Sequence, residues 1–121
     1  GGKIQQVLLN ILRNGAQAME EAGTEHPRFT LRTSYQEERD TVTFEIEDNG
    51  PGMPENIRKR VFEPFFTTKG VGTGTGLGLS VSYFIITENH GGTMDVMSTP
   101  GNGAAFIIGL PFQRGTENHG A

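Results

Sequence analysis

Two glycine-punctuated segments constrain this chain more than any other feature. The first is Asp48-Asn49-Gly50-Pro51-Gly52, and the second is Gly72-Thr73-Gly74-Thr75-Gly76-Leu77-Gly78-Leu79. Glycines at alternate positions remove the Cβ atoms that would hold a backbone away from a ligand, and their amides can bind anions at the start of a helix. The segments therefore indicate phosphate binding. Neither common phosphate loop is present, because the only Gly-Lys pair is Gly2-Lys3 and no glycines follow the GxGxxG spacing.

Length and charge narrow the choice of partner. The 121 residues suit one domain with a single core. A net charge of −4 argues against nucleic acid or an anionic membrane as a partner, since both attract a basic surface. The absence of cysteine leaves no disulfide framework or thiolate zinc site, which agrees with the cytoplasm. No apolar run reaches membrane-spanning length, so we expect no direct membrane contact from this segment.

Apolar periodicity predicts an α+β domain. Helical spacing indicates helices at roughly 3–22, 54–62 and 77–89. Alternation indicates strands at 28–35, 42–48, 93–99 and 104–110, paired as two hairpins. In the last helix we expect an inward face formed by Leu77, Val81, Phe84 and Ile85. This order favours a two-layer sandwich of a mainly antiparallel mixed sheet with helices on one face.

Asp48 is placed by the alternation of its strand. Counting by twos from Val42 reaches Asp48, so this carboxylate should face the core. A buried unpaired charge is costly. Asp48 therefore either accepts a hydrogen bond from a ligand amine, such as that of adenine, or caps the turn that follows it.

Asn10 and Asn14 lie four residues apart, on one face of the first helix at the edge of its apolar stripe. Their amide oxygens are hard donors, and Mg²⁺ takes few protein ligands when phosphates supply the rest. The alternative is that they are two surface amides.

Together these segments resemble the ATP-binding catalytic domain of bacterial sensor histidine kinases, in the superfamily with gyrase B, the heat-shock-90 chaperones and the mismatch-repair ATPases. Residues 6–16 resemble the N box, 48–53 the first glycine box, 62–69 the F box and 74–79 the second glycine box. The F-box sequence FEPFFTTK is most similar to the branch that includes nitrogen-regulation kinases. The resemblance implies a Bergerat-type ATP-binding fold over residues 1–114 without the usual first strand or strands, and we expect 115–121 to be a disordered tail.

The resemblance also implies ATP and Mg²⁺ as ligands. Asp48 would bind the adenine amino group, Asn14 would coordinate Mg²⁺, and Asn10 would support the phosphates or the water shell of the metal. Further nucleotide contacts would come from the glycine boxes and the F box: Gly50, Gly52, Phe62, Thr67, Thr68, Gly74, Thr75, Gly76, Leu77 and Gly78. Lys69 is a candidate γ-phosphate contact, or else a solvated lysine of the lid at 63–76. Phe62, Phe65 and Phe66 are interpreted mainly as hydrophobic plugs that dock this lid.

The residue at position 10, Asn10, distinguishes a kinase from an ATP hydrolase. ATP-hydrolysing members of the superfamily carry Glu at the place of Asn10, whose amide cannot accept a proton at neutral pH. Phosphoryl transfer needs mainly positioning and charge neutralisation, so transfer is favoured over hydrolysis, with Asn10 and Lys69 as candidate catalytic residues. The competing hypotheses are a nucleotide-binding or regulatory module without transfer activity and, less favoured, an anti-sigma-type serine kinase, which would keep the Glu.

The phosphate acceptor is expected outside this chain. The family's phosphorylated histidine is typically followed by an acidic residue, whereas His26 precedes proline and His90 and His119 precede glycine. We therefore expect a histidine-containing dimerisation domain of a parent kinase as the direct partner. A response-regulator receiver domain would follow through the parent, which can itself be membrane-anchored.

Overall fold

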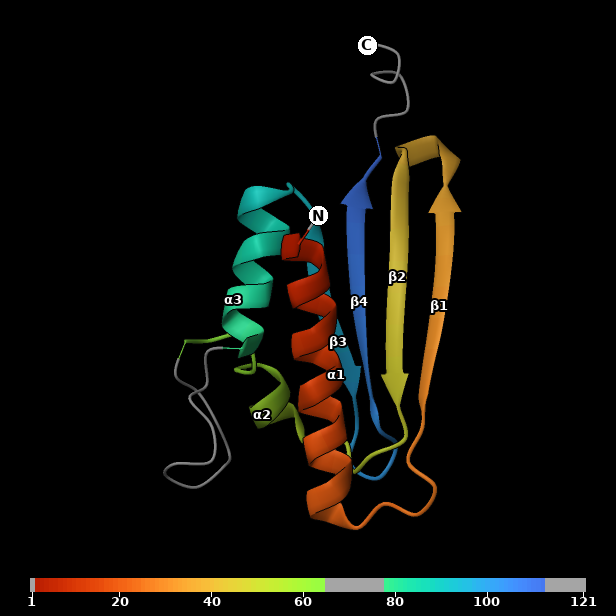
Figure 1. The fold of residues 1–121 in the computed structure, drawn as a ribbon, viewed down its shortest axis with the longest axis vertical. Coiled ribbons are helices and arrows are strands. Elements are labelled where there is room, and N and C mark those ends of the chain that lie inside the picture. Colours follow the sequence, from red (N-terminus) through yellow and green to blue (C-terminus); the bar gives the residue numbers. More distant parts are fainter. Residues whose placement is uncertain (1, 65–77, 113–121) are drawn as a thin grey trace.

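A computed structural model describes residues 2–64 and 78–112 (Figure 1). The helices and helical turns are α1 (Gly2–Ala22), η1 (Glu37–Arg39), α2 (Glu55–Arg58), α3 (Gly78–Phe84) and the π-helical turn η2 (Ile85–Asn89). The strands are β1 (Phe29–Gln36), β2 (Thr41–Asp48), β3 (Thr93–Ser98) and β4 (Ala104–Pro111). The helices cover one side of the sheet, which confirms the predicted α+β sandwich (Figure 1).

The sheet has the order β1-β2-β4-β3, and all three pairings are antiparallel. The last strand in sequence, β4, is therefore an interior strand. Ile46 of β2 lies opposite Phe106 of β4, which in turn lies opposite Val96 of β3. Residues directly opposite each other share a face of the sheet. These three side chains are buried under the helices.

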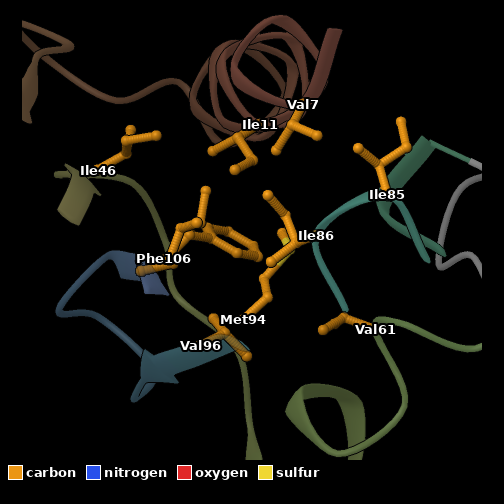
Figure 2. Close-up of a cluster of buried hydrophobic side chains, with 11 residues drawn as sticks. Val7, Ile11, Ile46, Val61, Ile85, Ile86, Met94, Val96 and Phe106 are labelled. Atoms are coloured by element: carbon orange, nitrogen blue, oxygen red, sulfur yellow. The ribbon is translucent and has the colours of Figure 1, made fainter. Parts of the chain in front are cut away.

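The core lies between this sheet face and α1. Its apolar residues recur at helical spacing, so one stripe of α1 faces the sheet. Val7 and Ile11 are fully buried on that stripe and point from α1 towards Phe106 and Ile86 (Figure 2). The helix ends before Gly23, which has φ +68° and donates its amide to the carbonyl of Glu20. The predicted first helix is confirmed.

The predicted inward face of the second long helix is right for Ile85, which is buried, but wrong for Val81 and Phe84. Val81 and Phe84 are 37% and 56% exposed, whereas Ser82 is completely buried. The inward stripe runs from Leu79 through Ser82 to the isoleucines of η2. Because Ser82 is polar, the stripe is not continuous in apolar residues and apolar spacing alone does not predict it. The wider π-helical turn brings the consecutive residues Ile85 and Ile86 into the core together. Leu77 is outside the described residues.

The second predicted helix is shorter than expected. Regular helix is confined to Glu55–Arg58, and residues 59–64 continue as turns and bends. The backbone bonds change there, with Arg60 donating to Ile57 and Glu63 donating to Arg60. Val61 is nevertheless buried in the core, so the segment is held by packing rather than by helical propensity.

The helix layer does not cover the edge strand β1. Phe29 packs against the core, but Leu31 is 62% exposed although its register partner Ile46 is buried. The opposite sheet face is polar: Arg32 contacts Glu45 at 3.2 Å and Glu47 at 2.8 Å, and the hydrogen bond with Glu47 raises the pKa of the guanidinium.

No helix within 2–64 and 78–112 is long and apolar enough to cross a membrane.

Candidate functional site

Asp48 ends β2 as a buried residue that is 9% exposed, as the alternation predicted. Oδ1 accepts hydrogen bonds from the backbone amides of Gly50 at 2.9 Å and Ala104 at 3.3 Å. Among the described residues no donor lies within hydrogen-bonding distance of Oδ2. The turn-capping interpretation is therefore confirmed, and it uses only one carboxylate oxygen. The second oxygen keeps its capacity to accept a hydrogen bond from a ligand amine.

Helix α1 passes directly beside this carboxylate at Gly15. A Cβ at that position would lie 3.1 Å from Oδ2 of Asp48 and 2.7 Å from the ring atom Cε1 of Phe29. The close approach thus depends on the missing side chain. Asn14 is the residue immediately before Gly15, so the backbone of the predicted metal ligand adjoins the point where α1 approaches the predicted adenine ligand.

The two asparagines of α1 are both half-buried, but their surroundings differ. The side-chain nitrogen of Asn10 donates to the carbonyl of Gly78 at 3.2 Å and to Oγ of Ser82 at 3.1 Å. Asn14 has no hydrogen-bond partner within the described ranges. Neither is a freely solvated surface amide. Asn10 connects α1 to the start of α3, while no described residue uses the hydrogen-bonding capacity of Asn14.

The first glycine segment is held by the β3–β4 turn. Gly52 has φ +72°, and a Cβ there would overlap the carbonyl oxygen of Thr99. The amide of Met53 donates to Oγ of Ser98 at 2.8 Å, and the amide of Gly101 donates to the carbonyl of Pro51 at 2.7 Å. Glycine is thus needed at position 52 for the protein's own packing, whatever contact a ligand adds.

Phe62 packs between the helix layer and the sheet. Its ring stacks on Tyr83 with centroids 4.9 Å apart and an interplanar angle of 26°, and it meets the edge of Phe106 at 6.2 Å. This packing agrees with the interpretation of Phe62 as a hydrophobic plug. Apart from Gly78, the other residues predicted from the F box and the second glycine box lie outside the described residues: Phe65, Phe66, Thr67, Thr68, Lys69, Gly74, Thr75, Gly76 and Leu77. The predicted tail at 115–121 lies outside them as well.

Within the described part of the predicted site, helix α1 contacts both glycine segments. It reaches the first segment through Gly15 and Asp48, and the second through Asn10 and Gly78. Within residues 2–64 and 78–112 no cluster of three or more histidine, aspartate or glutamate side chains could hold a metal ion. Asn14 as a metal ligand therefore implies an amide oxygen that acts together with oxygens of the nucleotide.

Sequence reasoning missed three contributors to this geometry. Ser82 binds Asn10, the amide of Ala104 binds Asp48, and Ser98 accepts from Met53 while donating to Gly103 at 2.7 Å. Only Ser82 carried a signal that could have been read, because it is a polar residue three positions after Leu79 and three before Ile85. The other two act through backbone groups or across a hairpin turn.

Comparison with known proteins places this geometry in a family. The family profile described as histidine kinase-, DNA gyrase B-, and HSP90-like ATPase matches residues 2–114. Sensor kinase CckA of Brucella abortus is 43% identical over 123 residues, covering 91% of this chain and 12% of the relative. The signal transduction histidine-protein kinase AtoS of Escherichia coli is 43% identical over 109 residues, covering 89% of this chain and 16% of the relative. The chain thus spans less than a fifth of either relative.

Solved structures support membership of the same family. The catalytic domain of histidine kinase ThkA superposes with a TM-score of 0.74 at 34% identity, covering 91% of this chain and 66% of that one. Full-length ShkA in complex with AMPPNP gives a TM-score of 0.76 at 32% identity, covering 92% of this chain and 22% of that one. The narrower resemblance to nitrogen-regulation kinases stays a prediction. The chain belongs to the histidine kinase-, DNA gyrase B-, and HSP90-like ATPase family and is homologous to the catalytic domains of sensor histidine kinases.

Proposed function

We propose that this chain binds Mg²⁺-ATP and transfers the γ-phosphoryl group to a histidine on a dimerisation domain outside the chain, as part of two-component signal transduction. The observation that carries the proposal is the arrangement around α1. A buried carboxylate with one unused oxygen lies against Gly15, and two half-buried asparagines lie on the preceding turns. The match to ShkA, which was solved with the ATP analogue AMPPNP, supports ATP as the ligand.

Asp48 would select the base. Its Oδ1 is held by two backbone amides, so the carboxylate is oriented before any ligand arrives. Oδ2 would then accept a hydrogen bond from the adenine amino group. Guanine carries a carbonyl at the corresponding position and would place an acceptor against an acceptor. A preorganised carboxylate of this kind discriminates between purines without moving.

Asn14 fits a metal that arrives with the nucleotide. It offers a half-buried amide oxygen with no partner among the described residues, and Mg²⁺ in phosphate sites takes one or two protein ligands with phosphates and waters supplying the rest. When bound, the metal neutralises charge on the phosphate chain. The contacts proposed for Lys69, Thr67, Thr68 and residues 74–78 rest on the sequence motifs.

The chemical step needs little from this chain beyond positioning. A ring nitrogen of the acceptor histidine attacks the γ-phosphorus, the bond to the β–γ bridging oxygen breaks, and ADP leaves with that oxygen. Asn10 would hold the phosphates or a metal-bound water in line, and its amide would not deprotonate an attacking water. The response regulator would then receive the phosphoryl group from the histidine.

Phosphotransfer provides the test. The chain is mixed with γ-labelled ATP and the separately made dimerisation domain of its parent kinase. We expect Mg²⁺-dependent, acid-labile label on the acceptor, and none on an acceptor whose histidine is replaced by glutamine. Tight binding of ADP without any transfer would instead support the nucleotide-binding module. Absence of nucleotide binding would contradict both.

A further inference from the structure

A three-member hydrogen-bond cluster joins α1 to the first turn of α3. The side-chain nitrogen of Asn10 donates to the Gly78 carbonyl at 3.2 Å and to Oγ of Ser82 at 3.1 Å, and Oγ of Ser82 itself donates to the Gly78 carbonyl at 2.9 Å. Ser82 is completely buried, so no solvent competes for its hydroxyl. The hydroxyl and the asparagine amide therefore depend on each other.

The donors and acceptors in this cluster favour one orientation of the asparagine, because the Gly78 carbonyl needs a donor. The Gly78 carbonyl can only accept, and the single hydroxyl proton of Ser82 is already donated to that carbonyl. Both neighbours of the amide are consequently acceptors, so its nitrogen and not its oxygen must face α3. A flipped amide would place Oδ1 against the Gly78 carbonyl with no proton between the two oxygens, even if the Ser82 hydroxyl turned to donate to Oδ1.

The direction of the amide oxygen Oδ1 of Asn10 follows from this orientation. Oδ1 lies on the opposite arm of the same planar group, and it has no partner among the described residues. An oxygen presented in this way accepts hydrogen bonds, which suits a water bound to Mg²⁺. It does not suit a bare phosphate oxygen. The cluster thus selects between the two tasks that the sequence left open for Asn10.

We propose that Ser82 is a positioning residue for phosphoryl transfer, which holds the Asn10 amide so that Oδ1 faces a water in the shell of the nucleotide-bound Mg²⁺. The inference rests on the proposed function and adds to it a residue that does not touch the ligand. Ser82 acts through Asn10, and the Gly78 carbonyl at the end of the second glycine box completes the cluster.

A buried serine in a helix often donates to the carbonyl four residues earlier, and this bond alone would affect only its own helix and not Asn10. Thr87 provides the comparison within the same helical segment. Its Oγ1 donates to the Tyr83 carbonyl at 2.8 Å, and the hydrogen bonds of Asn10 within the described residues go to Gly78 and Ser82 instead. Replacing Thr87 by alanine therefore removes the same type of bond without touching the asparagine.

The first measurement observes the asparagine directly. Side-chain amide signals of Asn10 in NMR spectra of the free chain are assigned with Asn10→Ala and compared in Ser82→Ala and Thr87→Ala. We expect Ser82→Ala to shift these signals and to speed exchange of the amide protons with water, while Thr87→Ala leaves them unchanged. Unchanged signals in Ser82→Ala would overturn the proposal, whatever the activity of the chain.

The second measurement observes the reaction with the acceptor domain described above. Ser82→Ala should slow transfer at saturating Mg²⁺-ATP by about tenfold, the equivalent of one hydrogen bond, while metal-free ADP affinity stays within about twofold. Ser82→Thr, which keeps the hydroxyl, should restore most of the rate. In an Asn10→Ala background Ser82→Ala should cause no further loss, because the two residues act as one unit.

The outcomes separate the two proposals. An active parent chain in which Ser82→Ala and Thr87→Ala transfer at equal rates would overturn the positioning role alone. A parent chain that binds nucleotide but never transfers would overturn the proposed function together with that role. Thermal unfolding of each variant identifies any that fails to fold, and Ser82→Thr then decides the question if Ser82→Ala is unfolded.

Discussion

The carboxylate of Asp48 accepts a hydrogen bond from the backbone amide of Ala104 at 3.3 Å, although 56 residues separate the two in the chain. The same oxygen accepts from the amide of Gly50. Asp48 therefore joins the end of β2 to the start of β4 in addition to any role in binding. A single substitution would mix these two functions, so two variants are needed to separate them.

Asp48→Asn should separate binding from folding. Asparagine keeps one oxygen for the two backbone amides but replaces the second oxygen by a donor, which cannot accept from the adenine amino group. We expect the affinity for both ADP and ATP to fall roughly ten- to a hundredfold, about 1.5–3 kcal/mol, with little change in thermal stability. Asp48→Ala should lower both affinity and stability. Calorimetry that finds unchanged ADP affinity in folded Asp48→Asn would rule out the assignment.

Asn14→Ala tests the metal ligand. The side chain has no partner among the described residues, so its loss should hardly change the free energy of unfolding. We expect ATP to bind this variant equally well with and without Mg²⁺, while adenosine affinity stays at the parent value. Gln5→Ala, on an exposed position of the same helix, serves as the control. Equal responses to Mg²⁺ in Asn14→Ala and the parent would contradict a metal contact.

Gly52→Ala should destabilise the protein more than Gly101→Ala does. Both glycines have positive φ, +72° and +84°, so both replacements carry the left-handed strain of about 1–2 kcal/mol. Only at position 52 does a Cβ meet backbone, that of Thr99 and Gly103, whereas none lies within 4 Å at position 101. We expect the difference in free energy of unfolding to be about 1–3 kcal/mol in urea titrations. Equal costs would mean that the contact relaxes freely.

Asn10→Asp should be less stable than Asn10→Ala at pH 8. The introduced carboxylate would place an oxygen against the Gly78 carbonyl in place of a donor, at a cost of about 1–3 kcal/mol. Alanine leaves Ser82 and Gly78 bonded to each other. Protonation favours the folded state here because the neutral carboxyl can donate, so the deficit should shrink as the pH falls from 8 to 5. A deficit independent of pH would argue against the carbonyl contact.

Leu31→Ala should have little effect on stability, within about 0.5 kcal/mol, because the side chain lies on the uncovered part of the sheet. Ile46→Ala, at its register partner on β2, should cost about 2–5 kcal/mol. Urea unfolding of both variants measures how far the helix layer extends across the sheet. A large effect at Leu31 would show that this edge is covered in solution.

Local patterns predicted much of the fold. The period of α1 identified the buried residues Val7 and Ile11, and counting by twos placed Asp48 in the core. These predictions succeeded because each depends on the geometry of one element. The strand boundaries agree with the structure to within a residue or two for the same reason.

The failures involve contacts between distant segments. Ser82 faces inward because its partner Asn10 lies 72 residues away, and no apolar pattern contains that information. The packing role of Gly52 was not predicted, because the Thr99 carbonyl that a Cβ would meet belongs to the β3–β4 turn, while the predicted ligand contact of Gly52 stays a prediction. Both contacts satisfy polar or steric demands that arise only once the sheet and helices have come together.

The interior position of β4 has a consequence for how the protein is made. A ribosome releases β1, β2 and β3 before residues 104–111, so the growing chain holds two unconnected edges with the central strand still to come. Such exposed edges favour association with other chains until the gap is filled. Ala104 belongs to that final strand, and Asp48 lacks its second amide donor until it arrives. A chain that stops before β4 therefore leaves Asp48 with a single amide donor, so the carboxylate that we propose as the adenine ligand is not yet fixed in its orientation.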